Sequence, residues 1–565
     1  MRATSLLFLS LFTPTLPAQI VGGEVQTIFR FDGESSSDAL GQAVSGAGDV
    51  NGDGVPDLIA GAWSADPGGM VFAGSAYVYS GADGSVIYQY NGSAAYEEFG
   101  VAVSAAGDVN NDGFDDFIIG ASGASPGGLG SAGSAFVYSG FNGSLLYQID
   151  GADVSYQLGS SVSGAGDVNN DGFDDFIIGA DSARSNGLFS SGSAFIYSGA
   201  NGTLLFQYDG GAAWDLFGHS VSGIGDVNSD GSDDFIIGAF SADPAGISAA
   251  GSAYIYSGAN GSLIYQYDGS AAFDGLGESV SAAGDVDGDG NPDFIIGAKG
   301  ADVAGITNAG SAYVYSGATG LLLHEFNGTQ ASSNFGFSVS NAGDFNGDGF
   351  DDVLVGANGA APEGMANAGS AFVYSGATGA LLFQANGDDP QDFMGMVAAA
   401  GDVDGNGYDD VFVGASGDDP GFVTGAGSAF VYGHHPFLTA NSNSISAATG
   451  ATIDFDLNFP ATAAADDYKI LISATGAGPT TYGVEIPLTQ DSVVIDTYLG
   501  NYPVPNHTRM HGTLDAAGNA SASLTAPAGL PSGLIGNSYW LAAIANQPGQ
   551  LPEYSSVAVM VLITP

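Results

Sequence analysis

The chain has 565 residues and is strongly acidic, with 61 Asp and Glu against 6 Lys and Arg and a formal net charge of −55. This charge repels phosphate backbones and anionic lipid, so it excludes nucleic acid and membrane surfaces as partners and favours cations. Apolar residues make up 45% of the chain, which suffices for a folded core, and the absence of cysteine excludes disulfides and thiolate chemistry.

Residues 1–18 predict a secretory signal peptide. Arg2 supplies a positive charge, Ser5–Phe12 is mostly apolar, and Leu16-Pro17-Ala18 places a small residue before a cut near Gln19. The alternative interpretation is a buried N-terminal strand. The apolar segment is too short to span a bilayer and no other segment comes close, so we expect a secreted, extracellular or cell-surface protein without membrane insertion.

From Asp49 onward a motif close to G-D-V-N-x-D-G recurs seven times, at intervals of 59 residues and once of 58. Each copy predicts four short strands separated by Gly-rich turns, and no segment has a helical period. Examples of the first to the fourth strand are Ala43–Ser45, Asp116–Gly120, Gly133–Gly140 and Ser262–Tyr267. A run of sheets with this regularity predicts a repeat architecture.

The number of strands predicts how the repeats close into a ring. The fourth strand follows only the first six copies, but Val25–Phe31 matches Leu263–Tyr267 and is likewise followed by Asp-Gly. The N-terminal strand therefore completes the last of seven four-stranded blades, which removes an exposed sheet edge. We expect an all-β fold: a seven-bladed β-propeller over residues 19–435.

The repeated loop reads D-x-[DN]-x-[DN]-G-x-x-D and predicts a Ca²⁺ site. Side-chain oxygens at positions 1, 3 and 5 converge when Gly at position 6 lets the loop curl, position 7 adds its carbonyl, and Asp at position 9 completes an all-oxygen shell. An EF-hand is excluded because Ala60 and Ile119 stand where it needs Glu at position 12. Acidic turns without metal are the alternative.

We predict up to seven Ca²⁺ ions, one per blade. The seventh loop is the weakest copy because Asn406 replaces Asp at position 5. The predicted ligands are Asp49, Asn51, Asp53, Val55, Asp57; Asp108, Asn110, Asp112, Phe114, Asp116; Asp167, Asn169, Asp171, Phe173, Asp175; Asp226, Asn228, Asp230, Ser232, Asp234; Asp285, Asp287, Asp289, Asn291, Asp293; Asp344, Asn346, Asp348, Phe350, Asp352; and Asp402, Asp404, Asn406, Tyr408, Asp410.

Over residues 24–433 the repeats resemble the FG-GAP repeats of integrin α-subunit propellers. The F-G half of that motif stands at Phe99-Gly100 and Phe217-Gly218, and the G-A half at Gly61-Ala62 and Gly120-Ala121, although its Pro is absent. The resemblance implies cell adhesion, with calcium loops on the lower face and a partner on the upper face. Integrins carry such loops in only some blades, so a full set implies stronger calcium dependence.

Residues 436–565 contain no copy of the repeat and predict a separate C-terminal β-sandwich. Their segments Ser444–Leu457 and Gly518–Pro531 look like the C-terminal sandwiches of secreted planctomycete-type bacterial proteins. The expected strands are Thr452–Asn458, Tyr468–Ser473, Ser492–Thr497, Ser521–Thr525, Tyr539–Ala545 and Ser556–Ile563.

The sequence contains no recognisable catalytic constellation. None of the six histidines has a spacing that indicates a shared zinc or a base with its partner, and His434-His435 is expected to be a solvated linker between domains. Variation between copies is concentrated in the segments that join the second and third strands, where loops on a rigid scaffold often carry recognition. The segments after each fourth strand lie on the same side. The candidate ligand-binding residues in these two sets of segments are Trp63, Arg184, Trp214, Phe240 and Lys299.

We therefore expect a calcium-dependent adhesion or ligand-binding module for a surface protein or polysaccharide, and not an enzyme. A propeller-fold polysaccharide lyase or hydrolase is the first alternative, since the abundance of Asp leaves paired carboxylates open. A structural surface or matrix component is the second. A convergent carboxylate or Lys/Arg cluster on the upper face would favour an enzyme, whereas scattered rim aromatics would favour binding.

Overall fold

The computed structural model describes residues 23–436 without a gap, followed by separate segments. The predicted signal peptide lies outside the described residues. The chain divides into two compact units, one built from Val25–Leu381 and Ala385–His435 and the other containing the strands after Pro436. The later segments are 438–440, 444–446, 451–459, 467–473, 480–481, 485–486, 507–508, 511–514, 519–526, 538–546, 554–555 and 559–564.

Within residues 23–436 the strands form seven four-stranded sheets, which confirms the predicted seven-bladed propeller. In each blade the strands pair in chain order, and the inner strands of successive blades pack against one another around the ring, from β2 against β6 to β26 against β2. The strands of blades 1 to 6 are β2–β5 (Ala43–Gly48, Asp57–Ala62, Ser75–Tyr79, Val86–Asn91), β6–β9 (Phe99–Gly107, Asp116–Ala121, Ser134–Tyr138, Leu145–Asp150), β10–β13 (Ser161–Gly166, Asp175–Ala180, Ser193–Tyr197, Leu204–Asp209), β14–β17 (Ser220–Gly225, Asp234–Ala239, Ser252–Tyr256, Leu263–Asp268), β18–β21 (Leu276–Gly284, Asp293–Ala298, Ser311–Tyr315, Leu322–Asn327) and β22–β25 (Ser338–Gly343, Asp352–Ala357, Ser370–Tyr374, Leu381–Asn386).

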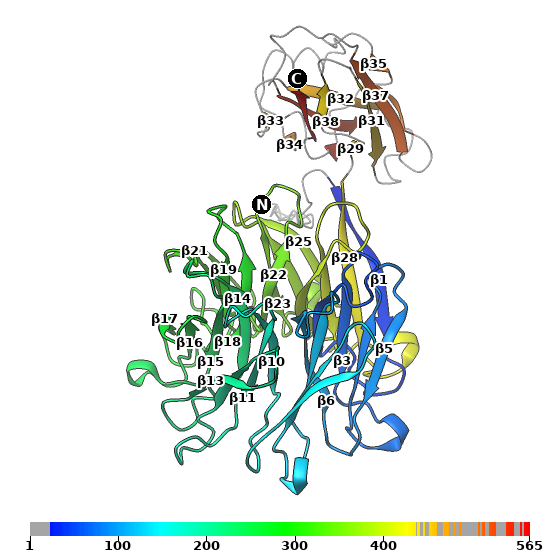
Figure 1. The fold of residues 1–565 in the computed structure, drawn as a ribbon. Coiled ribbons are helices and arrows are strands. Elements are labelled where there is room, and N and C mark those ends of the chain that lie inside the picture. Colours follow the sequence, from blue (N-terminus) through cyan, green and yellow to red (C-terminus); the bar gives the residue numbers. More distant parts are fainter. Residues whose placement is uncertain are drawn as a thin grey trace, which may run out of the picture. The chain divides into compact units, whose positions relative to one another are not determined.

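Blade 7 combines the two ends of the propeller, as the sequence predicts. Its sheet has the order β1-β28-β27-β26, with β1 at Gly23–Asp32, β26 at Met394–Gly401, β27 at Asp410–Ala415 and β28 at Ser428–Pro436. Figure 1 shows β1, in blue, beside β28, in yellow. Phe31 of β1 is buried and stacks on Tyr79 of blade 1 at 4.0 Å between ring centroids, so the closing strand also joins the core between blades 7 and 1.

The cores lie between the blades. The second strand of each blade is buried along its whole length, because neighbouring sheets cover both of its faces. The two glycines of the FG and GA pairs allow this close approach: a Cβ on Gly61 of β3 would lie 1.9 Å from the carbonyl oxygen of Gly100 in the next blade. Any side chain at Gly61 would therefore push two blades apart.

Helical structure is limited to short turns in the described part of the chain. Five 3₁₀ turns follow second strands, and each begins with Pro, which presets the required φ. They span Pro67–Gly69, Pro126–Gly128, Pro244–Gly246, Pro362–Gly364 and Pro420–Phe422. No helix among the described residues has the length and hydropathy needed to cross a membrane.

The described segments after Pro436 form β-strands in two main sheets. One has the order β29-β31-β37-β35 and the other the order β30-β40-β38-β32-β36, with β39 also paired to β38 and a small β33–β34 pair besides. The packing of these sheets into a sandwich stays a prediction, and the expected strand Ser492–Thr497 lies outside the described residues. The strands are β29 Leu438–Ala440, β30 Ser444–Ser446, β31 Ala451–Asn458, β32 Asp467–Ser473, β33 Thr480–Thr481, β34 Glu485–Ile486, β35 His507–Thr508, β36 His511–Thr513, β37 Asn519–Ala526, β38 Ser538–Asn546, β39 Tyr554–Ser555 and β40 Val559–Thr564.

Candidate metal centres and the opposite rim

The seven acidic loops connect the first and second strands of the blades, and the Asp at position 1 organises each loop. In blade 1, Asp49 Oδ1 accepts the N–H groups of Gly52 and Asp53 at 2.7 and 3.1 Å, and Oδ2 accepts the N–H of Gly54 at 2.9 Å. Gly54 has φ +88°, a conformation that favours glycine. The bond from the position-6 glycine to the position-1 carboxylate recurs in the other six loops.

Positions 3, 5 and 7 lie inside this curl. Asp53 Oδ1 accepts the N–H of Val55 at 2.9 Å, and the same contact joins positions 5 and 7 in the other six loops. Asn51 at position 3 faces position 9, with its amide nitrogen 3.2 Å from Asp57 Oδ1. In loops 5 and 7, where position 3 is Asp, carboxylate oxygens gather within 4.8 Å of one another: those of Asp285, Asp287 and Asp289, and those of Asp402, Asp404 and Asp410.

The Asp at position 9 begins each second strand and is fully buried. Asp57 Oδ1 accepts the N–H of Gly81, and Oδ2 accepts the N–H of Val50, both at 3.0 Å. Burial raises the pKa of Asp57 to about 6, and no Lys or Arg among the described residues pairs with it. Burial likewise raises the pKa of Asp293 to about 6, of Asp116, Asp175 and Asp234 to about 7, and of Asp352 and Asp410 to about 8.

These residues fit a hard divalent cation. A buried carboxylate without a counter-charge is costly, and a bound cation would supply that charge. Asp116 Oδ2 and Asp410 Oδ1 are buried without a hydrogen-bond partner, so loops 2 and 7 each offer a carboxylate oxygen that is still unused. The side chains of positions 1, 3, 5 and 9 would hold Ca²⁺, with the position-3 amide turned so that its oxygen faces the ion.

Comparison with known proteins identifies the repeats. The family model for the FG-GAP repeat matches residues 99–138, 158–197, 276–315, 335–374 and 394–432, which lie in blades 2, 3, 5, 6 and 7. Five of the seven blades are FG-GAP repeats. The chain is 30% identical to integrin alpha-V of Gallus gallus over 220 residues, which are 36% of this chain and 20% of that protein. It is 31% identical to integrin alpha-5 of Xenopus laevis over 220 residues, with the same coverage of 36% and 20%. The match therefore spans about a fifth of the length of these integrins.

In this propeller a second Asp, at position 8 of the loop, joins neighbouring acidic loops. Asp115 Oδ2 in blade 2 accepts the N–H of Asp49 in blade 1 at 2.7 Å. The equivalent pairs are Asp174 with Asp108, Asp233 with Asp167, Asp351 with Asp285, and Asp409 with Asp344, at 2.7–2.9 Å. We call this contact the interblade latch. Pro56 and Pro292 occupy position 8 in the other two loops.

The interblade latch was missed from sequence because position 8 looks variable and its partner lies 66 residues earlier in the chain. The available signal was the Asp-Asp pair at positions 8 and 9 of five loops. The predicted set of metal ligands includes the Asp at position 9 and not the Asp at position 8.

The end of the seventh blade differs from the expectation for His434 and His435. Strand β28 continues through both residues to Pro436, and His434 is fully buried rather than part of a solvated linker. Burial lowers the pKa of His434 to about 4, and its ring lies 5.1 Å from the ring of Tyr408 in the seventh loop. His435 Nε2 lies 3.4 Å from Asp404 Oδ2.

The rim of the FG-GAP propeller lies on the face opposite the metal loops, since strand connections alternate between the two faces. We define the rim as the segments between second and third strands and those between blades, residues 63–74 and 92–98 in blade 1. Trp63 is half-buried and stacks on Phe72 at 5.9 Å. Arg184 is exposed, and its guanidinium lies 3.9 Å from the centroid of the Phe189 ring. Trp214 is 63% exposed, and its backbone N–H donates to the Phe189 carbonyl.

The other two candidate ligand residues, Phe240 and Lys299, are half-buried and belong to a cluster around His219. His219 Nδ1 lies 3.0 Å from Asp181 Oδ2, and its ring packs against Phe240 at 4.5 Å. Lys299 pairs with Glu278, whose side chain is only 4% exposed, and lies 5.6 Å from the Phe240 ring centroid. The spacing of the histidines in the sequence gives no sign of this contact, because His219 and Asp181 lie 38 residues apart.

The His219 cluster joins three adjacent blades through two repeated positions. His219 and Glu278 each follow the glycine of an FG or LG pair, whereas Asp181, Phe240 and Lys299 each follow a GA pair. These positions recur in every copy, so their alignment could have revealed the cluster. In this arrangement the ammonium of Lys299 and the carboxylate of Glu278 neutralise each other.

Proposed function

We propose that this FG-GAP propeller is a secreted calcium-binding module that binds a surface protein or polysaccharide through its rim. The observation that carries the proposal is the separation of two faces. Uniform acidic loops occupy one face, and variable segments with exposed aromatic side chains occupy the other. Such side chains are typical anchors of binding surfaces, and a rigid scaffold keeps them in place.

Up to seven Ca²⁺ ions, one per blade, would bind at the loops. The support is the repeated oxygen set, the buried position-9 carboxylates and their lack of a Lys or Arg partner among the described residues. Calcium would neutralise carboxylates that otherwise repel one another, and this stabilises the blades that present the rim.

The proposed division of the chain is a signal peptide at 1–18, the propeller at 19–435 and a β-sandwich at 436–565. Secretion is supported by the apolar Ser5–Phe12 segment after Arg2 and by the similarity to integrin alpha subunits. An extracellular location also provides the calcium concentration at which such loops are occupied.

A binding function is favoured over catalysis because the charged side chains of the His219 cluster already pair with one another. Lys299 and Glu278 are paired with each other, and Asp181 already contacts His219. A lyase or hydrolase would need these groups to be free to face a substrate. A purely structural role would not require exposed aromatics such as Trp214 on the rim.

The test is a binding screen of the full mature chain against arrayed extracellular proteins and glycans, with calcium and with chelator. We expect a calcium-dependent partner whose binding is weakened by the double variant Trp63→Ala/Trp214→Ala. The control is Asn201→Ala in the β12–β13 turn on the metal-loop face, which should leave binding unchanged. A partner affected by Asn201→Ala and not by the rim variant would contradict the proposal.

A further inference from the structure

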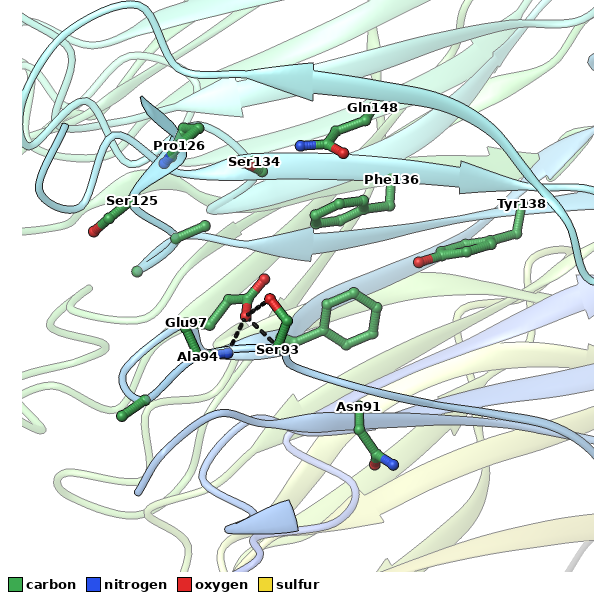
Figure 2. Close-up of a pocket in the computed structure, with 14 residues that line it drawn as sticks. Asn91, Ser93, Ala94, Glu97, Ser125, Pro126, Ser134, Phe136, Tyr138 and Gln148 are labelled. Atoms are coloured by element: carbon green, nitrogen blue, oxygen red, sulfur yellow. Dashed lines mark hydrogen bonds between the residues drawn. The ribbon is translucent and has the colours of Figure 1, made fainter. Parts of the chain in front are cut away.

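A cavity of about 350 Å³ lies between blades 1 and 2 at the rim (Figure 2). The end of β5, the blade-connecting segment 93–97, the segment 123–126 and strands β8 and β9 supply its walls. Phe136 and Tyr138 reach into it from β8, and Glu97 and Ser93 lie on the opposite wall (Figure 2). Its size is within the range of ligand-binding pockets.

The lining of this cavity combines aromatic rings with neutral polar groups. Phe99 and Phe136 both line it, with ring centroids 5.5 Å apart. Asn91 Oδ1 already accepts the Ser75 hydroxyl at 2.7 Å, and Gln148 Nε2 donates to Asp150 at 2.8 Å. Each amide nitrogen carries two N–H groups and each amide oxygen has two lone pairs, so both side chains keep further donors and acceptors for a ligand. The hydroxyl groups that join them are those of Ser93, Ser125, Ser134 and Tyr138.

The charge of the lining excludes an anionic ligand and disfavours a cationic one. Among the described residues that line the cavity there is no Lys, Arg or His, and Glu97 is the one carboxylate. Glu97 Oε2 already accepts the N–H groups of Ser93 and Ala94, at 2.6 and 2.8 Å, and the Ser93 hydroxyl at 3.0 Å. A cationic ligand would lose its hydration on entering the cavity, and the Glu97 carboxylate already accepts three hydrogen bonds from its own turn.

A neutral sugar matches this lining. One face of a sugar ring is made of C–H groups, which pack on an aromatic ring such as Phe136, and its hydroxyls both donate and accept hydrogen bonds. The equivalent cavity between blades 7 and 1, of about 240 Å³, instead contains Arg30, Asp32, Glu34 and Asp38. A lining with one carboxylate and no basic side chain among the described residues is thus not a general property of the repeat.

An aromatic track leads to the cavity across the rim. Trp63 stacks on Phe72, and the Phe72 ring lies 6.0 Å from the Tyr96 ring. Tyr96 stands between Ala95 and Glu97, which line the cavity. Tyr96 is 61% exposed and has φ +63°. The turn itself does not require an aromatic residue, because Ser155 and Ser332 occupy the same turn position in other blades with φ +57° and +58°.

We propose that the cavity between blades 1 and 2, together with the Trp63–Phe72–Tyr96 track, binds a neutral polysaccharide chain. The cavity takes one sugar unit and the track stacks against neighbouring units. This inference rests on the proposed function, because it assigns a ligand class to one sector of the rim.

The test is isothermal titration of the full mature chain, in calcium, with neutral hexasaccharides of glucose, mannose, galactose, xylose and N-acetylglucosamine. Oligogalacturonate and an oligolysine peptide are the charged comparisons. We expect at least one neutral hexasaccharide to bind, more tightly than its disaccharide. Gln148→Ala in the cavity and Tyr96→Ala in the track should each weaken it about tenfold. Phe141→Ala is the matched control, because Phe141 is 60% exposed on the metal-loop face, and it should change nothing.

The inference is overturned if no neutral hexasaccharide binds, if only the oligolysine binds, or if Gln148→Ala and Tyr96→Ala both leave affinity unchanged. If the sugars fail while an arrayed protein still binds and responds to Trp63→Ala/Trp214→Ala, the inference fails and the proposed function stands. If nothing binds in either experiment, both fail.

Discussion

Asp115 of blade 2 holds Asp49 of blade 1 through a 2.7 Å hydrogen bond from the Asp49 backbone N–H to Asp115 Oδ2. Asp49 is also position 1 of the first metal loop, and Asp115 stands next to Asp116, position 9 of the second. The interblade latch therefore ties the backbone of one candidate metal centre to the side chain of the next. A cation bound in one loop would therefore act on a contact that also holds two blades together.

Asp115→Ala should destabilise the propeller, because it leaves the Asp49 N–H without its acceptor. We expect a loss of roughly 1–3 kcal/mol in the free energy of unfolding, and a smaller loss for Asp115→Asn, which keeps an oxygen acceptor. Denaturant unfolding in calcium measures both. The control is Asp83→Ala, an exposed turn residue on the same face. Equal losses in the free energy of unfolding for Asp115→Ala and Asp83→Ala would contradict a stabilising role for the interblade latch.

Closure by β1 should be essential for a monomeric propeller. Removal of the mature chain through Gly33 exposes the edge of β28, and exposed edges pair with other chains. We expect aggregation or oligomers by size exclusion with light scattering. The milder variant Phe31→Ala should cost roughly 3–5 kcal/mol, because it empties a buried site against Tyr79. A truncated chain that stays monomeric with an unchanged melting temperature would contradict closure.

The pairing of Lys299 with buried Glu278 should appear in a double-mutant cycle. Lys299→Met leaves the Glu278 carboxylate without its cation and should cost roughly 1–3 kcal/mol, at the lower end for a lysine that is one-third exposed. The double variant Lys299→Met/Glu278→Gln should recover part of that loss. Additive effects in urea unfolding would show that the two side chains are not coupled.

The metal-free protein should lose stability as pH rises from about 4 to 8. The position-9 Asp residues have folded pKa values raised to between about 6 and 8, above the unfolded value, so the folded state binds more protons in this range. Calcium competes with these protons, and its stabilising effect should grow with pH. Melting temperatures in chelator across this range provide the measurement, and Asp352→Asn should flatten the slope. A melting temperature in chelator that rises with pH would contradict the assignment.

The repeat architecture could be predicted from sequence because its signals are local. The strand pattern, the 59-residue interval and the displaced match at Val25–Phe31 all lie in contiguous residues, and β1 at Gly23–Asp32 confirms the closing strand. The position of the metal loops between first and second strands follows from the same pattern. Fold and loop placement therefore needed no knowledge of contacts between blades.

The contacts that the strand pattern does not reveal join residues in different blades, and finding them requires aligned copies to be compared with their neighbours. The Asp115–Asp49 latch and the Asp181–His219 pair depend on which side chains two neighbouring blades present to each other. His434 looks polar in its own segment, yet β28 carries it into a buried position beside Tyr408. A single copy of the repeat contains only one side of each of these contacts.

The proposal that the acidic loops bind calcium and stabilise the propeller is best tested by calcium titration of the full mature chain. Its melting temperature is measured in calcium and in excess chelator. In about 10 mM calcium, sites with Kd of about 10⁻⁴–10⁻³ M would each contribute about 1.4–2.7 kcal/mol. We expect several bound ions per chain, up to seven, and a steep fall of the propeller's melting temperature on chelation. Binding of one ion or none, with a melting temperature that moves by only about a degree, would show that the acidic loops are turns without a metal function.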